Sequence, residues 1–454
     1  MPAELRLTAE QFDDLRGHLL QDDHEHAAIL VCGTSRSRKD LLLCQEVVPL
    51  GEDDLEQPAG RLHLHVSPLA LARAAKRAHA RGSTLVVCHS HPFPGPVAAS
   101  MIDLTTEQEL CGRVLPGRLV DRPVGALILG PDGYDGRLWA HARHQALSLR
   151  VAGTPLRNAG ATEGARPDDR DARHMLVWGA DGQLVLRQAR IAVVGAGGTG
   201  SHVVTQLAHL GVGQLLLIDP DVVELTNLNR LVGATTTDIG TAKVDVLADT
   251  ARRIHLGIHV EVVRVSLLDI DAALLGDVDV IMCCTDSHGS RALLTEVAAQ
   301  YLVPLVDLGV EVQADGRATR AGGGVRVIRP GGPCLHCMDV LDPALIREEF
   351  LTDRQRDEEV QRGYLRGSAE PAPSVVALNG VVASLAVLEV LDLLLELFVG
   401  QPNRILYRAE RRVITTATAS RETGCFVCGI TGLAGRGDAR PLARRPQEPR
   451  ARSG

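Results

Sequence analysis

Two regions with different hydrophobic patterns follow one another along the chain. In the first, Thr8 and Gln11 have capping-box spacing before an amphipathic stretch, which predicts a helix over 9–20. Short apolar runs in the same region predict strands at residues 26–34, 41–50, 83–88 and 123–130, with a helix at 67–81. From residue 191 buried strands alternate with helices, which is typical of a parallel sheet. The pattern therefore predicts an α+β region followed by an α/β region.

The α/β region begins with a strand, a glycine turn and a helix. Ile191–Val194 is a continuous apolar run, and Gly195, Gly197 and Gly200 follow it with GxGxxG spacing. Glycines let backbone amides approach an anion, and a helix N-terminus adds partial positive charge. Asp219 ends the next predicted strand, where a ribose hydroxyl needs an acceptor. The stretch predicts a nucleotide site.

Taken alone, this fingerprint is typical of an NAD-dependent Rossmann oxidoreductase, and that alternative stays open. The polar residues that follow favour a triphosphate with its metal. They offer cations, amides and carboxylates in place of the flat apolar pocket that a nicotinamide needs. The polar residues that favour a triphosphate are Asp221, Asn227, Asn229, Arg230, Lys243 and Asp286.

The motifs of this region, and their order along the chain, resemble those of the ThiF/MoeB family. Members of this family are adenylyltransferases that are similar to ubiquitin-activating enzymes. The motifs are GAGGTGS at 195–201 (Gly198 included), DxD at Asp219 and Asp221, NLNR at 227–230, Lys243, and CTD at 284–286. The resemblance implies Asp219 on the ribose, Asp286 on Mg²⁺, and Asn227, Arg230 and Lys243 on the triphosphate of ATP. It also implies that Arg173, in a segment similar to the family's RxxRQ motif, reaches the partner's ATP site in a homodimer.

Such a site suits adenylylation of a protein C-terminus. A terminal carboxylate is already ionised at neutral pH, so no general base is required, and catalysis becomes positioning and charge neutralisation. The resemblance implies a ubiquitin-like or sulfur-carrier protein ending in Gly-Gly as partner. Some relatives activate a small molecule or a tRNA base, which is a second alternative. Thioester-forming members carry a cysteine near the position of Ala369, but no cysteine lies between Cys337 and Cys425.

A second motif lies in the amino-terminal third. His89-Ser-His91 places two imidazoles on one side of an extended segment, and Ser100-x-x-Asp103 adds a hydroxyl and a carboxylate. This resembles the JAMM (MPN) metalloproteases, with Glu25 matching their upstream glutamate. The resemblance implies that His89, His91 and Asp103 bind a catalytic Zn²⁺, that Glu25 is the general base, and that Ser100 stabilises the oxyanion. Eight residues separate His91 from Ser100, where the family usually has seven, and an inactive MPN scaffold is the alternative.

Two CxxC pairs indicate a third site. Four thiolates in two pairs nearly ninety residues apart suit a closed, tetrahedral, structural zinc site, with a redox CxxC as the alternative. The cysteines are Cys334, Cys337, Cys425 and Cys428.

Composition limits the remaining possibilities. The net charge is −8 and aromatic residues make up 2% of the 454 residues, so neither a phosphate backbone nor stacked bases are expected as ligands. No basic segment with an apolar core opens the chain, and the apolar run 381–399 carries three acids on one helical face. Cytoplasmic location without a membrane span is therefore expected.

These patterns predict a JAMM/MPN α+β domain at 1–150, a linker at 151–169 and a Rossmann-like ThiF domain at 170–430. A basic disordered tail is expected at 431–454. The ThiF domain should have a mostly parallel sheet with an antiparallel extension. Together the domains predict ATP-dependent adenylylation of a carrier, coupled to zinc-dependent processing or deconjugation of that carrier. A non-catalytic scaffold remains a further alternative.

Overall fold

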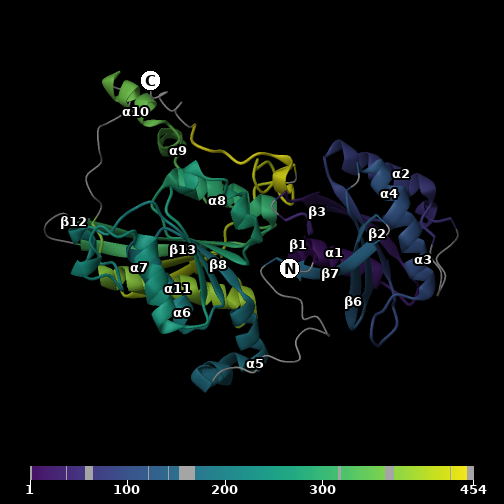
Figure 1. Ribbon diagram of the computed structural model, residues 1–454, viewed down its shortest axis with the longest axis horizontal. Coiled ribbons are helices and arrows are strands. Elements are labelled where there is room, and N and C mark those ends of the chain that lie inside the picture. The colour runs from purple at the N-terminus through teal and green to yellow at the C-terminus, as the bar shows by residue number, and fades with distance from the viewer. Residues whose placement is uncertain are drawn as a thin grey trace. The chain divides into compact units, whose positions relative to one another are not determined.

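The computed structural model describes most of the chain, and its contacts divide it into two units (Figure 1). The barrel unit comprises Met1–Glu163, Ala299–Leu302 and Leu433–Pro441, and the sheet unit comprises the rest. Most of the predicted linker at 151–169 lies outside the described residues. Those are 3–36, 38–56, 65–120, 122–141, 143–152, 169–314, 319–362, 373–429 and 431–446.

Seven strands of the barrel unit form a closed barrel in the order β1-β3-β2-β4-β5-β6-β7. β1 closes it by pairing in parallel with both β3 and β7. The four predicted strands are confirmed, whereas β1 and the closure were not predicted. The strands are β1 (Ala3–Leu7), β2 (Ala27–Thr34), β3 (Leu41–Pro49), β4 (Thr84–Ser90), β5 (Val124–Gly130), β6 (Gly133–Ala140) and β7 (Arg143–Val151).

Helices cover both faces of these strands. α1 (Ala9–Leu19) begins at the predicted capping box, where Gln11 N donates to Thr8 Oγ1 at 3.1 Å, and it packs on the apolar cluster that contains Val86 and Cys88. The opposite face, with Leu85, is covered by α2 (Pro68–Ala80) and by the helical segment α3 (Met101–Glu109), a π-turn and α4 (Leu115–Arg118). Side chains alternate along β4, so His89 falls on the α2 and α3 side.

The sheet unit contains an eight-stranded sheet in the order β10-β9-β8-β11-β12-β13-β14-β15. Neighbours from β10 to β12 pair in parallel, and β13 to β15 continue antiparallel. This confirms the predicted Rossmann-like sheet with its extension. The strands are β8 (Arg190–Val194), β9 (Gln214–Ile218), β10 (His259–Val263), β11 (Val280–Cys283), β12 (Leu305–Ala314), β13 (Thr319–Ile328), β14 (Arg404–Arg408) and β15 (Val413–Ala417).

Helices also lie on both faces of this sheet. α6 (Gly198–His209), α7 (Lys243–Ile254) and α11 (Val376–Leu395) share one core cluster, and α8 (His288–Tyr301) lies on the other face (Figure 1). Of the described helices, α11 alone has the length and apolar composition of a membrane span, but its residues Val382, Ala386 and Val390 are buried in that cluster. Three further helices are α5 (Ala172–Gln188), α9 (Pro343–Glu349) and α10 (Asp353–Gln361).

The strand order places a crevice at the carboxyl ends of β8 and β11. These strands are neighbours, but the helices that follow them, α6 and α8, pack on opposite faces of the sheet (Figure 1). Connections that leave in opposite directions open a ligand site between them. The predicted nucleotide site therefore lies at the topological switch point.

Part of the tail that is predicted to be disordered belongs to the described residues. The structure describes residues 431–446, where Leu433 is buried, Gly435 N donates to Ala299 O at 3.0 Å and Arg445 N donates to Leu268 O at 2.7 Å. Backbone hydrogen bonds and a buried apolar side chain hold this part of a segment whose polar composition predicts disorder.

Candidate active sites

The glycine turn requires its glycines at two positions. Gly195 has a φ of +99°, and a Cβ there would lie 2.7 Å from the carbonyl group of Cys284. A Cβ on Gly200 would lie 1.9 Å from Gly195 O, so this glycine serves the packing of helix on strand. Nothing lies within 4 Å of a Cβ built on Gly197, just before α6 begins at Gly198. The residue that precedes α6 thus faces open space.

That space is a cavity of about 720 Å³ at the switch point. Its wall brings together most of the residues predicted to bind ATP and Mg²⁺. They are Gly195, Gly197, Gly198, Asp219, Asp221, Arg230, Lys243 and Asp286.

Asp219 is held firmly at the end of β9. Its carboxylate accepts hydrogen bonds from Ala196 N at 2.7 Å and from Asp221 N at 2.8 Å. Burial raises the pKa of this carboxyl group, while the two backbone donors oppose the rise. The side chain is fixed next to the glycine turn, as a ribose acceptor needs to be.

Two cations and a carboxylate face the same cavity. Lys243 Nζ lies 2.8 Å from Asp221 Oδ2 at the start of α7. Arg230 is partly buried and donates to Thr226 O at 2.7 Å and to Asn229 Oδ1 at 3.1 Å. Asp286 is exposed just beyond β11. Positive and negative groups at one cavity can hold phosphates together with a divalent cation.

Three predicted residues lie elsewhere. Asn227 is 8% exposed and its Oδ1 accepts from Glu224 N at 3.1 Å, so it caps a short turn (Leu225–Asn227) and does not line the described cavity. Gly200 lies beneath the turn. Arg173 is exposed on α5, away from the cavity of its own chain, and its action across a dimer stays a prediction.

Sequence reasoning missed three residues on the cavity wall. Arg291 of α8 donates to the fully buried Asp307 at 2.9 Å, and Glu349 accepts from the backbone amides of His288 and Gly289 at 3.1 and 2.8 Å. Arg445 comes from the tail. Arg291 follows Asp286 in the sequence by just over one helical turn, so the sequence near this motif could have indicated it. Glu349 and Arg445 reach the cavity through long-range contacts, which leave no local signal.

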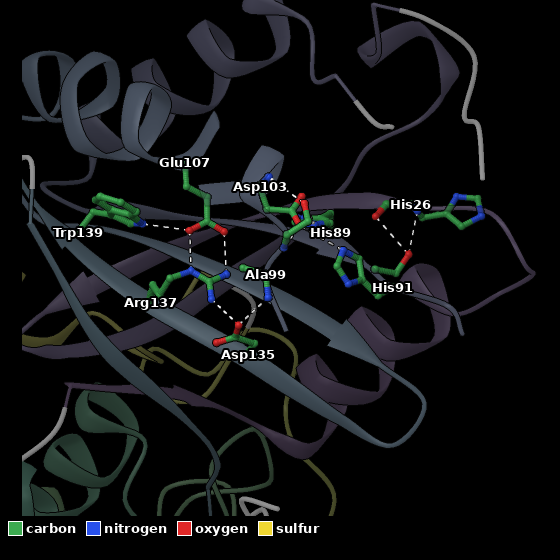
Figure 2. A network of polar contacts seen from close by, with 11 residues as sticks. His26, His89, His91, Ala99, Asp103, Glu107, Asp135, Arg137 and Trp139 are labelled. Atoms are coloured by element: carbon green, nitrogen blue, oxygen red, sulfur yellow. Dashed lines mark hydrogen bonds and ion pairs between the residues drawn. The ribbon is translucent and has the colours of Figure 1, made fainter. Parts of the chain in front are cut away.

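The metal motif in the barrel unit forms a compact cluster (Figure 2). His89 Nε2 lies 3.4 Å from Asp103 Oδ1, and His91 Nε2 lies 3.5 Å from Asp103 Oδ2. One ligand atom from each residue lies within 4.8 Å of the others, and His89 Nε2 is buried without a hydrogen-bond partner. Two imidazoles and a carboxylate at this spacing fit a zinc ion with an open position.

The pKa shifts of two residues in this cluster favour the protonation states that bind a cation. Burial alone would raise the pKa of Asp103, but the adjacent His89 imidazole and hydrogen bonds with Ser100 hold that pKa well below its usual range. Burial lowers the pKa of His91. An ionised carboxylate and a neutral imidazole are the forms that bind metal.

A cavity of about 680 Å³ adjoins this cluster, and Glu25 and Ser100 lie on its wall with the three ligands. Glu25 is 7% exposed. Ser100 is the N-cap of α3, and its Oγ accepts from Asp103 N at 3.1 Å. The residue before it, Ala99, donates its amide to Asp135 Oδ2 at 2.9 Å. Despite the longer spacer, Ser100 is thus the residue at the cavity.

A buried ion-pair network supports α3 from below (Figure 2). Arg137 donates to both oxygens of Glu107 at 2.7 and 2.8 Å, and Trp139 Nε1 donates to the same carboxylate at 3.1 Å. Arg137 also lies 2.5 Å from Asp135, which holds Ala99. The network therefore connects the end of α3 with the loop before Asp103.

The four cysteines of the sheet unit converge as predicted. Their sulfur atoms lie within 4.8 Å of one another, with Cys334 to Cys425 at 3.6 Å and Cys337 to Cys428 at 3.4 Å. Hydrogen bonds from Cys428 and from backbone amides lower the pKa of Cys334, which favours a thiolate. Four thiolates without an open position fit a structural zinc ion.

Comparison with known proteins agrees with this geometry for the sheet unit. Residues 171–427 match the ThiF family. The SAMP-activating enzyme E1 of Haloferax volcanii is 30% identical over 272 residues, which cover 58% of this chain and 90% of that protein. The molybdopterin-synthase adenylyltransferase of Escherichia coli is 32% identical over 253 residues, covering 55% and 90%. A solved structure of E. coli MccB with MccA-N7isoASN aligns over 58% of this chain and 76% of its own, at 22% identity and a TM-score of 0.47. The family match begins at residue 171, so the barrel unit has no family assignment.

Proposed function

Because the chain belongs to the ThiF family, we propose that its sheet unit adenylylates the C-terminal glycine of a ubiquitin-like or sulfur-carrier protein. The observation that carries the proposal is the convergence of Arg230, Lys243 and Asp286 with the glycine turn at one cavity. The similar proteins named above include an activating enzyme for SAMP and an adenylyltransferase for molybdopterin synthase. The oxidoreductase alternative has no such support.

Each group has a role in this reaction. Asp219 accepts a ribose hydroxyl, and the first turn of α6 binds phosphate through its amides. Arg230 and Lys243 would offset charge on the phosphates, and Asp286 would hold Mg²⁺, which would offset further negative charge on them. The carboxylate of the carrier attacks the α-phosphorus, so the new bond is a mixed anhydride and pyrophosphate leaves.

A second cavity supports a protein tail as the nucleophile. It measures about 550 Å³ and shares Arg291, Gly309 and Val310 with the first cavity. Its wall includes Gly322–Gly324 of β13, three glycines that pack closely against their neighbours. A diglycine tail lying there would point its carboxylate toward the phosphates.

The expected product is a free or transferred acyl-adenylate. Cys283 is fully buried, and burial raises the pKa of Cys284, so neither thiol suits a thioester step. The equivalent of the family's thioester position, near Ala369, lies outside the described residues.

The test is carrier-dependent exchange of labelled pyrophosphate into ATP. Wild-type protein should exchange with a carrier that ends in Gly-Gly, and Asp286→Asn should lower exchange at least 100-fold. Asp271→Asn, a helix cap away from the cavity, is the control. Equal exchange without any carrier would favour a small molecule or tRNA base instead, and no exchange with any diglycine carrier would contradict the proposal.

We further propose that the chain acts as a homodimer in the cytoplasm, with Arg173 reaching the partner's ATP site. Arg173 is exposed on α5, and two apolar neighbours, Leu176 and Val177, are 86% and 70% exposed. Such an apolar surface suits a subunit interface. Sedimentation of wild type and of a Leu176→Asp variant tests this proposal, which a monomeric wild type would contradict.

For the barrel unit we propose a zinc-dependent peptidase that cleaves after the glycine tail of the same carrier. The support is the cluster of His89, His91 and Asp103 beside Glu25 and Ser100 in one cavity. Zinc supplies a water molecule of lowered pKa at neutral pH. Glu25 accepts and returns the proton, and Ser100 can donate to the oxyanion.

The test uses a carrier fused through its terminal glycine to a reporter protein. Wild type should release the reporter, while Glu25→Gln should retain zinc and lose at least 100-fold in rate. Glu109→Gln, on the rim of the same cavity, is the matched control. Zinc bound without cleavage of any fusion or isopeptide substrate would favour the inactive scaffold.

A further inference from the structure

We infer that Arg445, from the tail of the chain, is a positioning residue for the ATP cavity. This inference rests on the proposed adenylylation. Arg445 lies on the cavity wall and is partly buried, although its segment has the composition of a disordered tail. Its backbone and its guanidinium group make contacts on two sides of the cavity.

On one side Arg445 binds the turn Leu267–Asp269. Its backbone N donates to Leu268 O at 2.7 Å, and Nη1 donates to Asp269 Oδ2 at 3.2 Å. Leu267 and Leu268 are buried and belong to the cavity wall. Arg445 therefore fixes a turn that supplies two apolar residues of this wall.

On the other side Arg445 binds the end of α9. Nε and Nη2 donate to Glu349 O at 3.2 and 3.1 Å. The carboxylate of Glu349 in turn accepts from the amides of His288 and Gly289 and from the Ser287 hydroxyl, directly after Asp286. One guanidinium group thus connects the apolar wall with the start of α8, where Mg²⁺ is proposed to bind.

An arginine suits this connection better than other residues. Its planar group carries five donors in fixed directions, and three of them reach the two sides at once. The adjacent Arg444 makes one long contact, from Nη2 to Asp269 O at 3.4 Å, and does not line the described cavity. Arg444 is therefore a matched control for charge and position in the chain.

The experiment measures binding of a non-hydrolysable ATP analogue with Mg²⁺ by calorimetry to the full chain. Arg445→Ala should raise Kd roughly tenfold, since it removes charge-assisted hydrogen bonds that hold the wall. Arg445→Lys should raise Kd a few-fold, and Arg444→Ala should leave it unchanged. Removing residues 442–454 should reproduce Arg445→Ala, whereas removing 447–454 should have no effect.

Exchange kinetics separate positioning from general stability. With carrier saturating, Arg445→Ala should raise KM for ATP about tenfold and change kcat by less than threefold. Equal Kd values for Arg445→Ala and Arg444→Ala would overturn the inference while leaving the adenylylation proposal intact. A loss of binding that Arg445→Lys does not relieve, with a lowered melting temperature, would show a purely structural role and also overturn it. A wild type that does not bind the analogue would overturn both proposals.

Discussion

At the scale of single residues, the nucleotide site could be predicted from the sequence wherever a local motif fixes a side chain. Gly195 needs a positive φ, and Asp219 ends a strand beside it, so both follow from short-range patterns. Asn227 is a residue for which the motif and the structure differ. Its motif predicts a phosphate contact, whereas its amide oxygen accepts from Glu224 N within the same turn.

Lys243 gives a direct test of the site. Its ammonium group lies 2.8 Å from Asp221 at the cavity, where it can also reach a phosphate. Lys243→Ala should lower kcat/KM for pyrophosphate exchange by roughly 10- to 100-fold, the effect of losing a hydrogen bond to a charged group. Arg264→Ala breaks a bidentate ion pair with Asp245 of the same helix α7 and lies away from the cavity, so it should leave exchange unchanged. Equal rates for the two variants would exclude Lys243 from the site.

Glu4 of β1 makes the stability of the barrel unit depend on pH. Burial alone would raise its pKa, but Arg6, Arg150 and Arg38 together lower the pKa from 4.5 to about 2. Because the folded pKa lies below the unfolded value, this group stabilises the fold above pH 4.5, and the contribution disappears as pH falls toward 2. From the two pKa values the contribution is about 3 kcal/mol.

Glu4→Gln should therefore lose about 3 kcal/mol of unfolding free energy at pH 7 and roughly 1 kcal/mol near pH 2.5. The chain has two tryptophans, and Trp139 belongs to the barrel unit while Trp178 belongs to the sheet unit. In a Trp178→Phe background the fluorescence of Trp139 reports the barrel unit alone. A loss that is constant between pH 7 and pH 2.5 would contradict this role for Glu4.

At the scale of elements, the sequence predicts helices and strands well but not which of them close a barrel. The Thr8 capping box and the apolar run 83–88 are local signals, and both elements are confirmed. β1 has five residues, all buried, and pairs with β7 about 140 residues later, so nothing near it in the chain indicates its place. Its pairing is decided by long-range contacts.

The buried ion-pair network of Glu107, Arg137 and Asp135 connects helix α3 with the metal cluster. Arg137→Met would leave the Glu107 carboxylate buried, with Trp139 Nε1 as its remaining donor among the described residues, which should cost about 3–5 kcal/mol of stability. It would also release Asp135 and the loop before Asp103, so zinc affinity of the barrel unit should fall at least tenfold.

The double variant Glu107→Leu with Arg137→Met is the control for that prediction. Replacing both charges by apolar groups removes the unpaired carboxylate, so most of the lost stability should return. Zinc affinity should stay low, because Asp135 still lacks its partner. Melting followed by Trp139 fluorescence, together with zinc titration, gives both quantities. Full recovery of zinc affinity in the double variant would show that the network does not position the loop.

At the scale of the whole molecule, both candidate metal clusters follow from residue spacing, and the family match covers residues 171–427. His-x-His on a strand and the two CxxC pairs each brought their ligands together within 4.8 Å. The sequence does not predict that the tail contributes Arg445 to the wall of the ATP cavity. Arg445 reaches this cavity through contacts with residues 96 and 176 positions away. Such contacts depend on the complete fold and leave no periodic signal.

Counting zinc ions tests both metal sites in the full chain. Wild type should contain two zinc ions per chain, and a chelator should remove one quickly, because three protein ligands leave an open position beside a cavity whereas four thiolates leave none. His91→Ala should abolish the fast fraction and peptidase activity but preserve pyrophosphate exchange. Cys425→Ser should abolish the slow fraction and lower the melting temperature of the sheet unit, because the cluster joins segments about ninety residues apart. If wild type held one zinc ion and His91→Ala retained it, the barrel unit would be a scaffold, and carrier adenylylation would be the chain's whole chemistry.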